Sequence, residues 1–265
     1  MVFHSPFEYS YLWLPLIGFI VGMLASMIGG GGGFFFPPLL IMLFKVPAQI
    51  AVATSLAATI PICIIGAAGH YRLGNLDWRT GLTLGLAGIF GALAGATVTG
   101  WLSPDQLKRS FGAYSFILGL LVIFRKSESI KKSAANKGSM IKRLFNRIPK
   151  GSFYGFAGGV ITGTFGTSGT APVLAGLFAI KMPVKLIAGT SLMIIFINTI
   201  SGLAGHLVLG VVDLTLVWFL TSGTVVGAVM GPLLTSGLKP ARNEGAIRKI
   251  FAFIMIGFGI IMILS

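Results

Sequence analysis

Long apolar runs separated by short polar or basic stretches fill most of the chain. Six runs carry few charges and reach the length of a membrane-spanning helix, which needs about 20 apolar residues. These runs lie at positions 48–70, 79–101, 107–124, 184–206, 215–237 and 247–264. The pattern therefore predicts an all-α polytopic membrane protein.

Two further apolar segments, 11–44 and 154–180, are interrupted by residues that break helices. The first contains a run of glycines followed by Pro37-Pro38, and the second contains a Gly/Ser/Thr stretch followed by Pro172. Irregular backbone at membrane depth is tolerated only where it is buried in protein or lines a cavity. We therefore predict that each segment is a broken helix that folds back on itself, either re-entrant or as a full hairpin.

The chain also contains an internal repeat. Between Lys45 and Pro104, matching residues recur 136 positions later without a gap, and in the opening segments the spacing is 137. Shared composition alone does not hold a register over so long a stretch. We predict one transmembrane repeat at 11–124, a basic linker at 125–150 and a second repeat at 151–265, each with a broken opening helix and three spans.

Composition and charge agree with a membrane location. Hydrophobic residues make up 55% of the chain and charged residues 10%, whereas soluble domains carry about 25% charged residues. The net charge of +14 does not indicate a nucleic-acid binder, because nine of the 20 basic residues lie in the linker. The single cysteine, Cys63, excludes an internal disulfide or a cysteine-based zinc site and is interpreted as an apolar filler.

The distribution of basic residues favours one topology. If each opening segment returns to its starting side, 17 basic residues face the cytoplasm and three face outward; if it crosses once, the split is 11 to 9. Lys and Arg are enriched in cytoplasmic loops. We therefore expect both termini outside, the linker in the cytoplasm, and two halves that are inverted copies, as in many secondary transporters.

The helix breaks are the first candidates for a binding site. An interrupted helix presents unpaired N–H groups and the positive end of its dipole, and glycine lets an anion approach the backbone closely. The alternative role of small residues, close helix packing, suits the scattered glycines of 81–95 better than a continuous run. The candidate substrate-binding residues are Gly29, Gly30, Gly31, Gly32, Gly33, Gly166, Thr167, Ser168, Gly169 and Thr170.

Side chains in the following spans extend this set. Four hydroxyl residues occupy matching positions near the start of those spans: Thr54, Ser55, Thr190 and Ser191. They either face a shared central site or bond to their own helices. Asn198 is a lone amide in an apolar run, acting either as an interhelical hydrogen-bonding residue or as a ligand contact.

Two histidines occupy matching positions at the ends of spans. His70 and His206 are candidates for a gating or proton-linked role, because histidine titrates near physiological pH. The structural alternative is a turn that closes with a helix-capping aspartate, since Asp77 and Asp213 each follow seven residues later.

No recognisable motif indicates an enzyme, a cofactor or a metal site. The glycine run precedes Phe-Phe-Phe instead of Lys-Ser/Thr, so it is not a nucleotide-binding loop. None of the six acidic residues lies clearly within a span. A site built from helix ends without carboxylates favours an anion over a cation.

Several motifs occur together: a glycine-rich break followed by proline, Val46-Pro47 before Ala-x-Ala-Thr-Ser-Leu, Gly-x-x-Gly-His-x-x-x-Gly-x-x-Asp at 66–77, and a basic linker between the halves. Together they resemble the sulfite exporter TauE/SafE family of permeases. The resemblance implies a prokaryotic inner-membrane transporter of small anions, chiefly sulfur-containing ones such as sulfite or organosulfonates. Thr167 and Ser168 depart from a glycine run, so the two halves need not contribute equally.

These observations predict a secondary transporter that works by alternating access around one anion site between the two breaks. The alternatives are a passive anion channel, a permease for a non-sulfur anion, and a non-transporting membrane scaffold or sensor. The expected partners are the anion, the lipid bilayer and further copies of the chain, with no nucleic acid and no cofactor.

Overall fold

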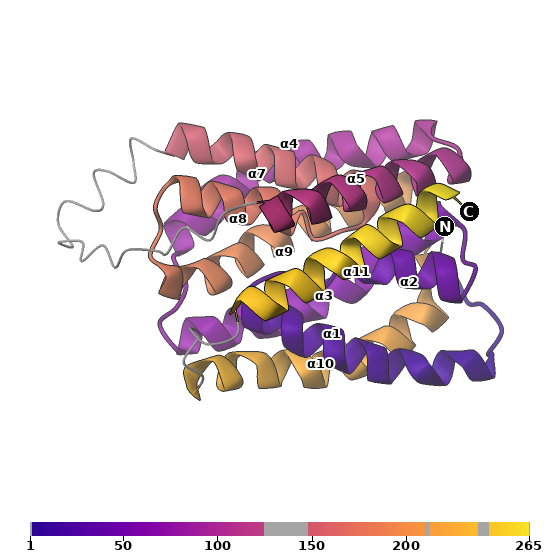
Figure 1. Ribbon diagram of the computed structural model, residues 1–265, viewed down its shortest axis with the longest axis horizontal. Coiled ribbons are helices and arrows are strands. Elements are labelled where there is room, and N and C mark those ends of the chain that lie inside the picture. The colour runs from indigo at the N-terminus through magenta and orange to yellow at the C-terminus, as the bar shows by residue number, and fades with distance from the viewer. Residues whose placement is uncertain (1, 125–147, 210–211, 238–243, 265) are drawn as a thin grey trace.

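The computed structural model describes residues 2–124, 148–209, 212–237 and 244–264, and these residues are almost entirely helical (Figure 1). The first half contains η1 (Tyr9–Trp13), α1 (Leu14–Ile28), α2 (Phe36–Leu43), α3 (Ala48–Arg72), α4 (Trp78–Trp101) and α5 (Pro104–Phe124). The second half contains α7 (Ile148–Phe165), α8 (Thr170–Ala179), α9 (Val184–Leu209), α10 (Leu214–Gly237) and α11 (Glu244–Leu264). Two short strands, β1 (Val2–Phe3) and β2 (Val212–Asp213), pair in parallel.

The prediction of an all-α polytopic membrane protein is confirmed. Within the described residues, six helices are long and apolar enough to cross a membrane: Tyr9–Ile28, Ala48–Arg72, Trp78–Trp101, Pro104–Phe124, Val184–Val208 and Leu214–Leu234. Five of them match predicted spans, and the sixth is the first part of the opening segment. The predicted span at 247–264 falls in α11, of which Ala252–Leu264 forms a shorter apolar helix. The basic linker lies outside the described residues as far as position 147.

Both opening segments are broken and fold back, as predicted. In the first, the rings of Tyr11 at the start and Phe44 at the end lie 5.8 Å apart. In the second, Tyr154 near the start of α7 packs against Gly176 of α8. Gly29 ends α1 with φ +82°, a left-handed conformation that favours glycine.

The two halves interlock through pairs of helices, one from each half. Figure 1 shows α1 beside α10 at one edge of the molecule and α4 beside α7 at the opposite edge. Glycines make these contacts close: Gly159 of α7 meets the backbone of Gly88 in α4, and Gly227 of α10 meets the backbone of Phe19 in α1. Such close approach is how small residues promote helix association in membranes. The packing role predicted for the glycines of 81–95 is therefore confirmed at Gly91 and Gly95, which contact α7.

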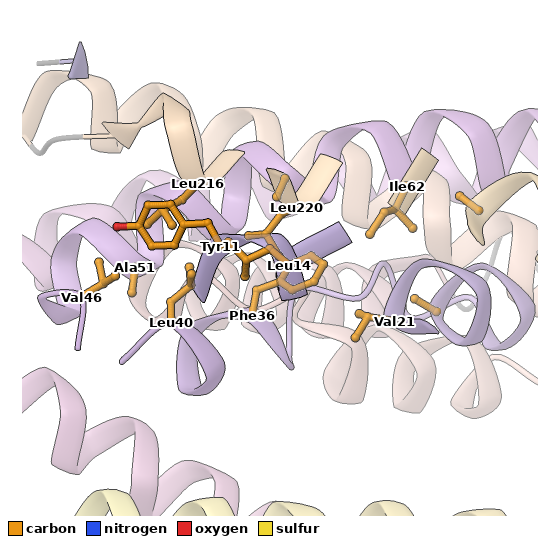
Figure 2. Packing of buried hydrophobic residues seen from close by; sticks show 13 residues of the cluster. Tyr11, Leu14, Val21, Phe36, Leu40, Val46, Ala51, Ile62, Leu216 and Leu220 are labelled. Atoms are coloured by element: carbon orange, nitrogen blue, oxygen red, sulfur yellow. The ribbon is translucent and has the colours of Figure 1, made fainter. Parts of the chain in front are cut away.

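A buried cluster holds the short helix α2 against its neighbours. Figure 2 shows Phe36 and Leu40 of α2 among Leu14 of α1, Ala51 of α3 and Leu220 of α10. Phe36 and Leu40 are fully buried. Inside a bilayer the surrounding lipid is as apolar as these side chains, so burying them brings no hydrophobic gain. The cluster therefore stabilises α2 through close packing and dispersion contacts.

The central helices α3 and α9 pack against each other in opposite directions. Gly29 contacts Ala188 near the start of α9, while Ser26 in the preceding turn bonds to His70 near the end of α3. At the other end, Gly166 contacts Val52 near the start of α3. Antiparallel α3 and α9 are what an inverted repeat requires, and the orientation of each half across a bilayer stays a prediction.

Candidate functional site

The two helix breaks, distant in sequence, lie against each other inside the bundle. A Cβ placed on Gly33 would lie 3.0 Å from both the backbone N and the Oγ of Ser168, and one on Gly31 would lie 3.2 Å from the same Oγ. The Thr170 hydroxyl donates to the Gly30 carbonyl oxygen at 2.7 Å. Glycine in the first break thus allows the polar second break to approach its backbone directly.

The two predicted serines face the breaks, and each serves the break of the opposite half. The Ser191 hydroxyl on α9 donates to the carbonyl oxygen of Gly29 at 2.7 Å. At the matching position on α3, the Ser55 hydroxyl donates to the carbonyl oxygen of Gly166 at 2.8 Å and lies 3.3 Å from that of Gly33. These serines tie each break to the central helix of the other half.

The neighbouring threonines point elsewhere, because successive residues on a helix project about 100° apart. The Thr190 Oγ1 accepts a hydrogen bond from the backbone N–H of Asp77 at 2.9 Å, and the Thr54 Oγ1 accepts one from Asp213 at 3.3 Å. The predicted capping role of the aspartates is confirmed: Asp77 accepts from the Arg79 N–H at 3.1 Å and Asp213 from the Thr215 N–H at 3.0 Å. The threonines therefore anchor the turns that start α4 and α10.

The two histidines bond to the last turn of the opening helices. Their Nε2 atoms lie 2.9 Å from the Ser26 carbonyl oxygen for His70 and 2.7 Å from the Gly163 carbonyl oxygen for His206. Since a carbonyl oxygen only accepts, Nε2 carries the hydrogen in both rings. Both histidines are buried, and both pair with carbonyls that the end of a helix leaves without an intrahelical partner.

At both breaks, the helix-end carbonyls and the groups inside the break differ in their hydrogen bonds. The carbonyl groups at the ends of α1 and α7 are capped by hydroxyls or imidazoles, at Ser26, Gly29, Gly30, Gly163 and Gly166. Within the breaks, none of the described hydrogen bonds uses the backbone N–H of Gly31, Gly32, Gly33, Thr167, Ser168 or Gly169, and only three carbonyls, those of Gly31, Thr167 and Ser168, are likewise without one. A buried donor left unpaired costs about 1–3 kcal/mol.

Two side chains add to this set of free donors. The hydroxyls of Thr167 and Ser168 make no hydrogen bond to any described group, although each residue is only 1% exposed. Helix α8 begins directly after the second break and α2 begins three residues after Gly33, so the N-terminal, positive end of each dipole is the end nearer to its break. The region is therefore rich in donors, electropositive and free of carboxylates among the residues that form it.

An aromatic cluster that we did not predict borders the breaks. Phe34 follows the first glycine run and Phe165 precedes the second break; both contact Phe111 of α5, with ring centroids 5.9 and 5.7 Å away. Tyr114 stacks on Phe165 at 5.3 Å. The sequence signal was the placement of Phe34 and Phe165 directly beside the glycines, but their common partner on α5 is a tertiary contact.

Comparisons with known proteins agree with this architecture. The profile of the family described as sulfite exporter TauE/SafE matches residues 14–262. The chain is 29% identical to the probable membrane transporter protein YdhB of Bacillus subtilis, over 88% of this chain and 93% of that one. It is 26% identical to the probable membrane transporter protein YunE of the same organism, over 94% and 96% of the two chains.

An archaeal relative is also similar: a probable membrane transporter protein of Methanocaldococcus jannaschii is 27% identical over 78% of this chain and 77% of its own. No solved structure gives a significant match. The family is described as one of exporters, and all three relatives are named as membrane transporter proteins. Because the family profile covers nearly the whole chain, including both breaks and all the central helices, this protein belongs to the sulfite exporter TauE/SafE family.

Proposed function

We propose that this membrane transporter carries small anions, with sulfite or an organosulfonate as substrate, by alternating access around the two helix breaks. The observation that carries the proposal is the difference between hydrogen-bond acceptors and donors at the two breaks. Their helix-end carbonyls are capped, whereas six backbone N–H groups and the hydroxyls of Thr167 and Ser168 take part in none of the described hydrogen bonds. An oxyanion offers only acceptors and satisfies such a set of donors.

The chemistry of the site favours an anion over a cation, without identifying the particular anion. A buried cation favours carboxylates, and the residues of the breaks include none; the carbonyls of Gly29 and Gly166 are already bonded to Ser191 and Ser55. An anion gains from the N-terminal dipoles of α2 and α8 and from close access to glycine backbone. The proposed site comprises the breaks at 29–33 and 166–170, which Ser55 of α3 and Ser191 of α9 support; Thr54 and Thr190 hold the neighbouring turns.

The way the halves are joined supports alternating access. Each break bonds to the central helix of the other half, so a rotation of one half displaces the break of its partner. We propose a location in a prokaryotic inner membrane with both termini outside. A monoanion leaving a negative interior gains about 2.3 kcal/mol per 100 mV, so export needs no titrating group.

Uptake of labelled sulfite into proteoliposomes holding the purified full-length protein tests the proposal. Sulfate, thiosulfate and small sulfonates serve as competitors. We expect saturable uptake with counterflow, inhibited by the preferred anion. Flux that rises linearly with concentration and shows no counterflow would instead indicate a channel, and absence of flux from folded protein would overturn the function proposed.

Gly169→Val tests the site within the same assay. Gly169 has φ +54°, and an added side chain would meet the backbone of Gly158, so we expect transport to be lost. Gly257→Val of α11 is the matched control, because nothing lies within 4 Å of a Cβ added there. Equal rates for the two variants would overturn the assignment of the site.

A further inference from the structure

Asn198 of α9 is fully buried, and neither atom of its carboxamide pairs with any described group. A lone amide inside a membrane bundle is costly unless it has a partner. Of the two roles that the sequence leaves open, hydrogen bonding between helices finds no support, because the described hydrogen bonds include none from this side chain. The remaining role is contact with a ligand.

The carboxamide and the second break both border Gly158 of α7. It packs against Gly88 of α4, where an added Cβ would collide with it. A Cβ on Gly158 of α7 would lie 3.6 Å from the Asn198 Nδ2 and 3.3 Å from the carbonyl oxygen of Gly169. Two glycines thus provide room for the amide beside a residue of the break.

The first half carries no equivalent group at the matching position. Asn198 corresponds to Ile62 at the spacing of 136, and Gly169 corresponds to Gly32 at the spacing of 137. The Ile62 Cδ1 lies 3.0 Å from the position of a Cβ on Gly32, so the first half has an apolar side chain where the second half has an amide.

The same difference recurs at three further buried positions. Thr167, Ser168 and Thr199 of the second half each have an unpaired hydroxyl. Their counterparts in the first half are Gly30, Gly31 and Cys63. At these four matched positions the unpaired polar side chain therefore belongs to the second half, although the first half has unpaired buried atoms elsewhere, at His70 Nδ1 and Ser115 Oγ.

We propose that Asn198 is a specificity-determining residue of the anion site, whose Nδ2 donates to the substrate held at the second break. This inference rests on the proposed function. The side-chain contacts to the substrate then come from the second half, while the first half contributes backbone N–H groups. The substrate site is asymmetric although the fold is duplicated.

Two variants of the full-length protein test the role of Asn198 in the sulfite uptake assay. Asn198→Ala removes the carboxamide without a clash, and Asn198→Asp keeps its shape but replaces the donor with a carboxyl group. Loss of a hydrogen bond to a charged ligand lowers affinity about 10-fold or more, so we expect KM to rise by that factor. The control is Ser115→Ala on α5, which also removes a fully buried polar group without a described partner, in this case a hydroxyl.

A second measurement separates binding from folding. We expect the thermal unfolding temperature without substrate to stay close to that of the unaltered protein in Asn198→Ala, because no hydrogen bond to the protein is lost. An unchanged KM in both variants, or a fall in unfolding temperature without a change in KM, would overturn the role of Asn198. Absence of flux in the unaltered protein would overturn the proposed function as well, so the two failures are distinguishable.

Discussion

The hydroxyl of Ser55 on α3 donates to the carbonyl oxygen of Gly166, which lies 111 positions later in the chain, at the break of the opposite half. Ser191 on α9 makes the reciprocal bond to Gly29. Each serine caps a helix end that the break leaves without intrahelical partners. The pair therefore caps one helix-end carbonyl at each break, whereas the N–H groups of residues 31–33 and 167–169 take part in none of the described hydrogen bonds.

Removing this cap is expected to destabilise the fold. In Ser55→Ala, the buried carbonyl of Gly166 loses its partner, at a cost of about 1–3 kcal/mol in the free energy of unfolding. Thermal unfolding in detergent measures the loss. Ser222→Ala is the control, because its exposed hydroxyl bonds only to the preceding turn of α10, at the Phe219 carbonyl. An unfolding temperature for Ser55→Ala equal to that of the control would contradict the capping role.

Removing a free hydroxyl of the second break is expected to change transport without lowering stability, the reverse of the effect at Ser55. Ser168→Ala removes a buried hydroxyl that has no described partner, so stability should be maintained or raised. If this hydroxyl donates to the anion, KM for sulfite should rise about 10-fold. Steady-state uptake measures KM, and Thr97→Val serves as control, since its exposed hydroxyl bonds to its own helix. Lower stability with an unchanged KM would mean that Ser168 is structural.

The histidines distinguish capping from proton-linked gating. The bond from His206 to the Gly163 carbonyl favours capping. His206→Gln keeps a donor and should preserve both transport and its dependence on pH, whereas His206→Ala should lower the unfolding temperature. Uptake measured between about pH 5.5 and 8, the range in which a histidine side chain changes its charge, checks this. Loss of pH dependence in folded His206→Gln would instead assign a proton-linked role.

The glycine contacts between halves predict a folding defect far from the breaks. In Gly159→Leu the added side chain would meet the backbone of Gly88 and Ala92. Overpacking costs about 1–3 kcal/mol or more when backbone must move, and this contact joins the two halves. Size-exclusion chromatography after detergent extraction should show loss of monodisperse protein for Gly159→Leu and normal elution for Gly257→Leu. Normal elution of both variants would show that the α4–α7 contact is not essential.

Local chemistry in the sequence determined the elements of this protein. Apolar length alone predicted α3, α4 and α9, because the bilayer sets the length of a span. Glycine and proline placed the two breaks, since they act on the backbone where they stand. Asp77 was identified as a helix cap for the same reason: its partner, the Arg79 N–H, is two residues away.

Tertiary structure alone decided which side chains serve the breaks. Thr54 and Ser55 are adjacent and chemically alike, yet one anchors the start of α10 and the other caps α7. Asn198 appeared as a possible link between helices, and only the packing of Gly88 and Gly158 around it shows an amide without a partner. Periodicity reports which face of a helix is buried. It does not report which distant backbone atom that face will meet, because that depends on how two halves of one chain pack together.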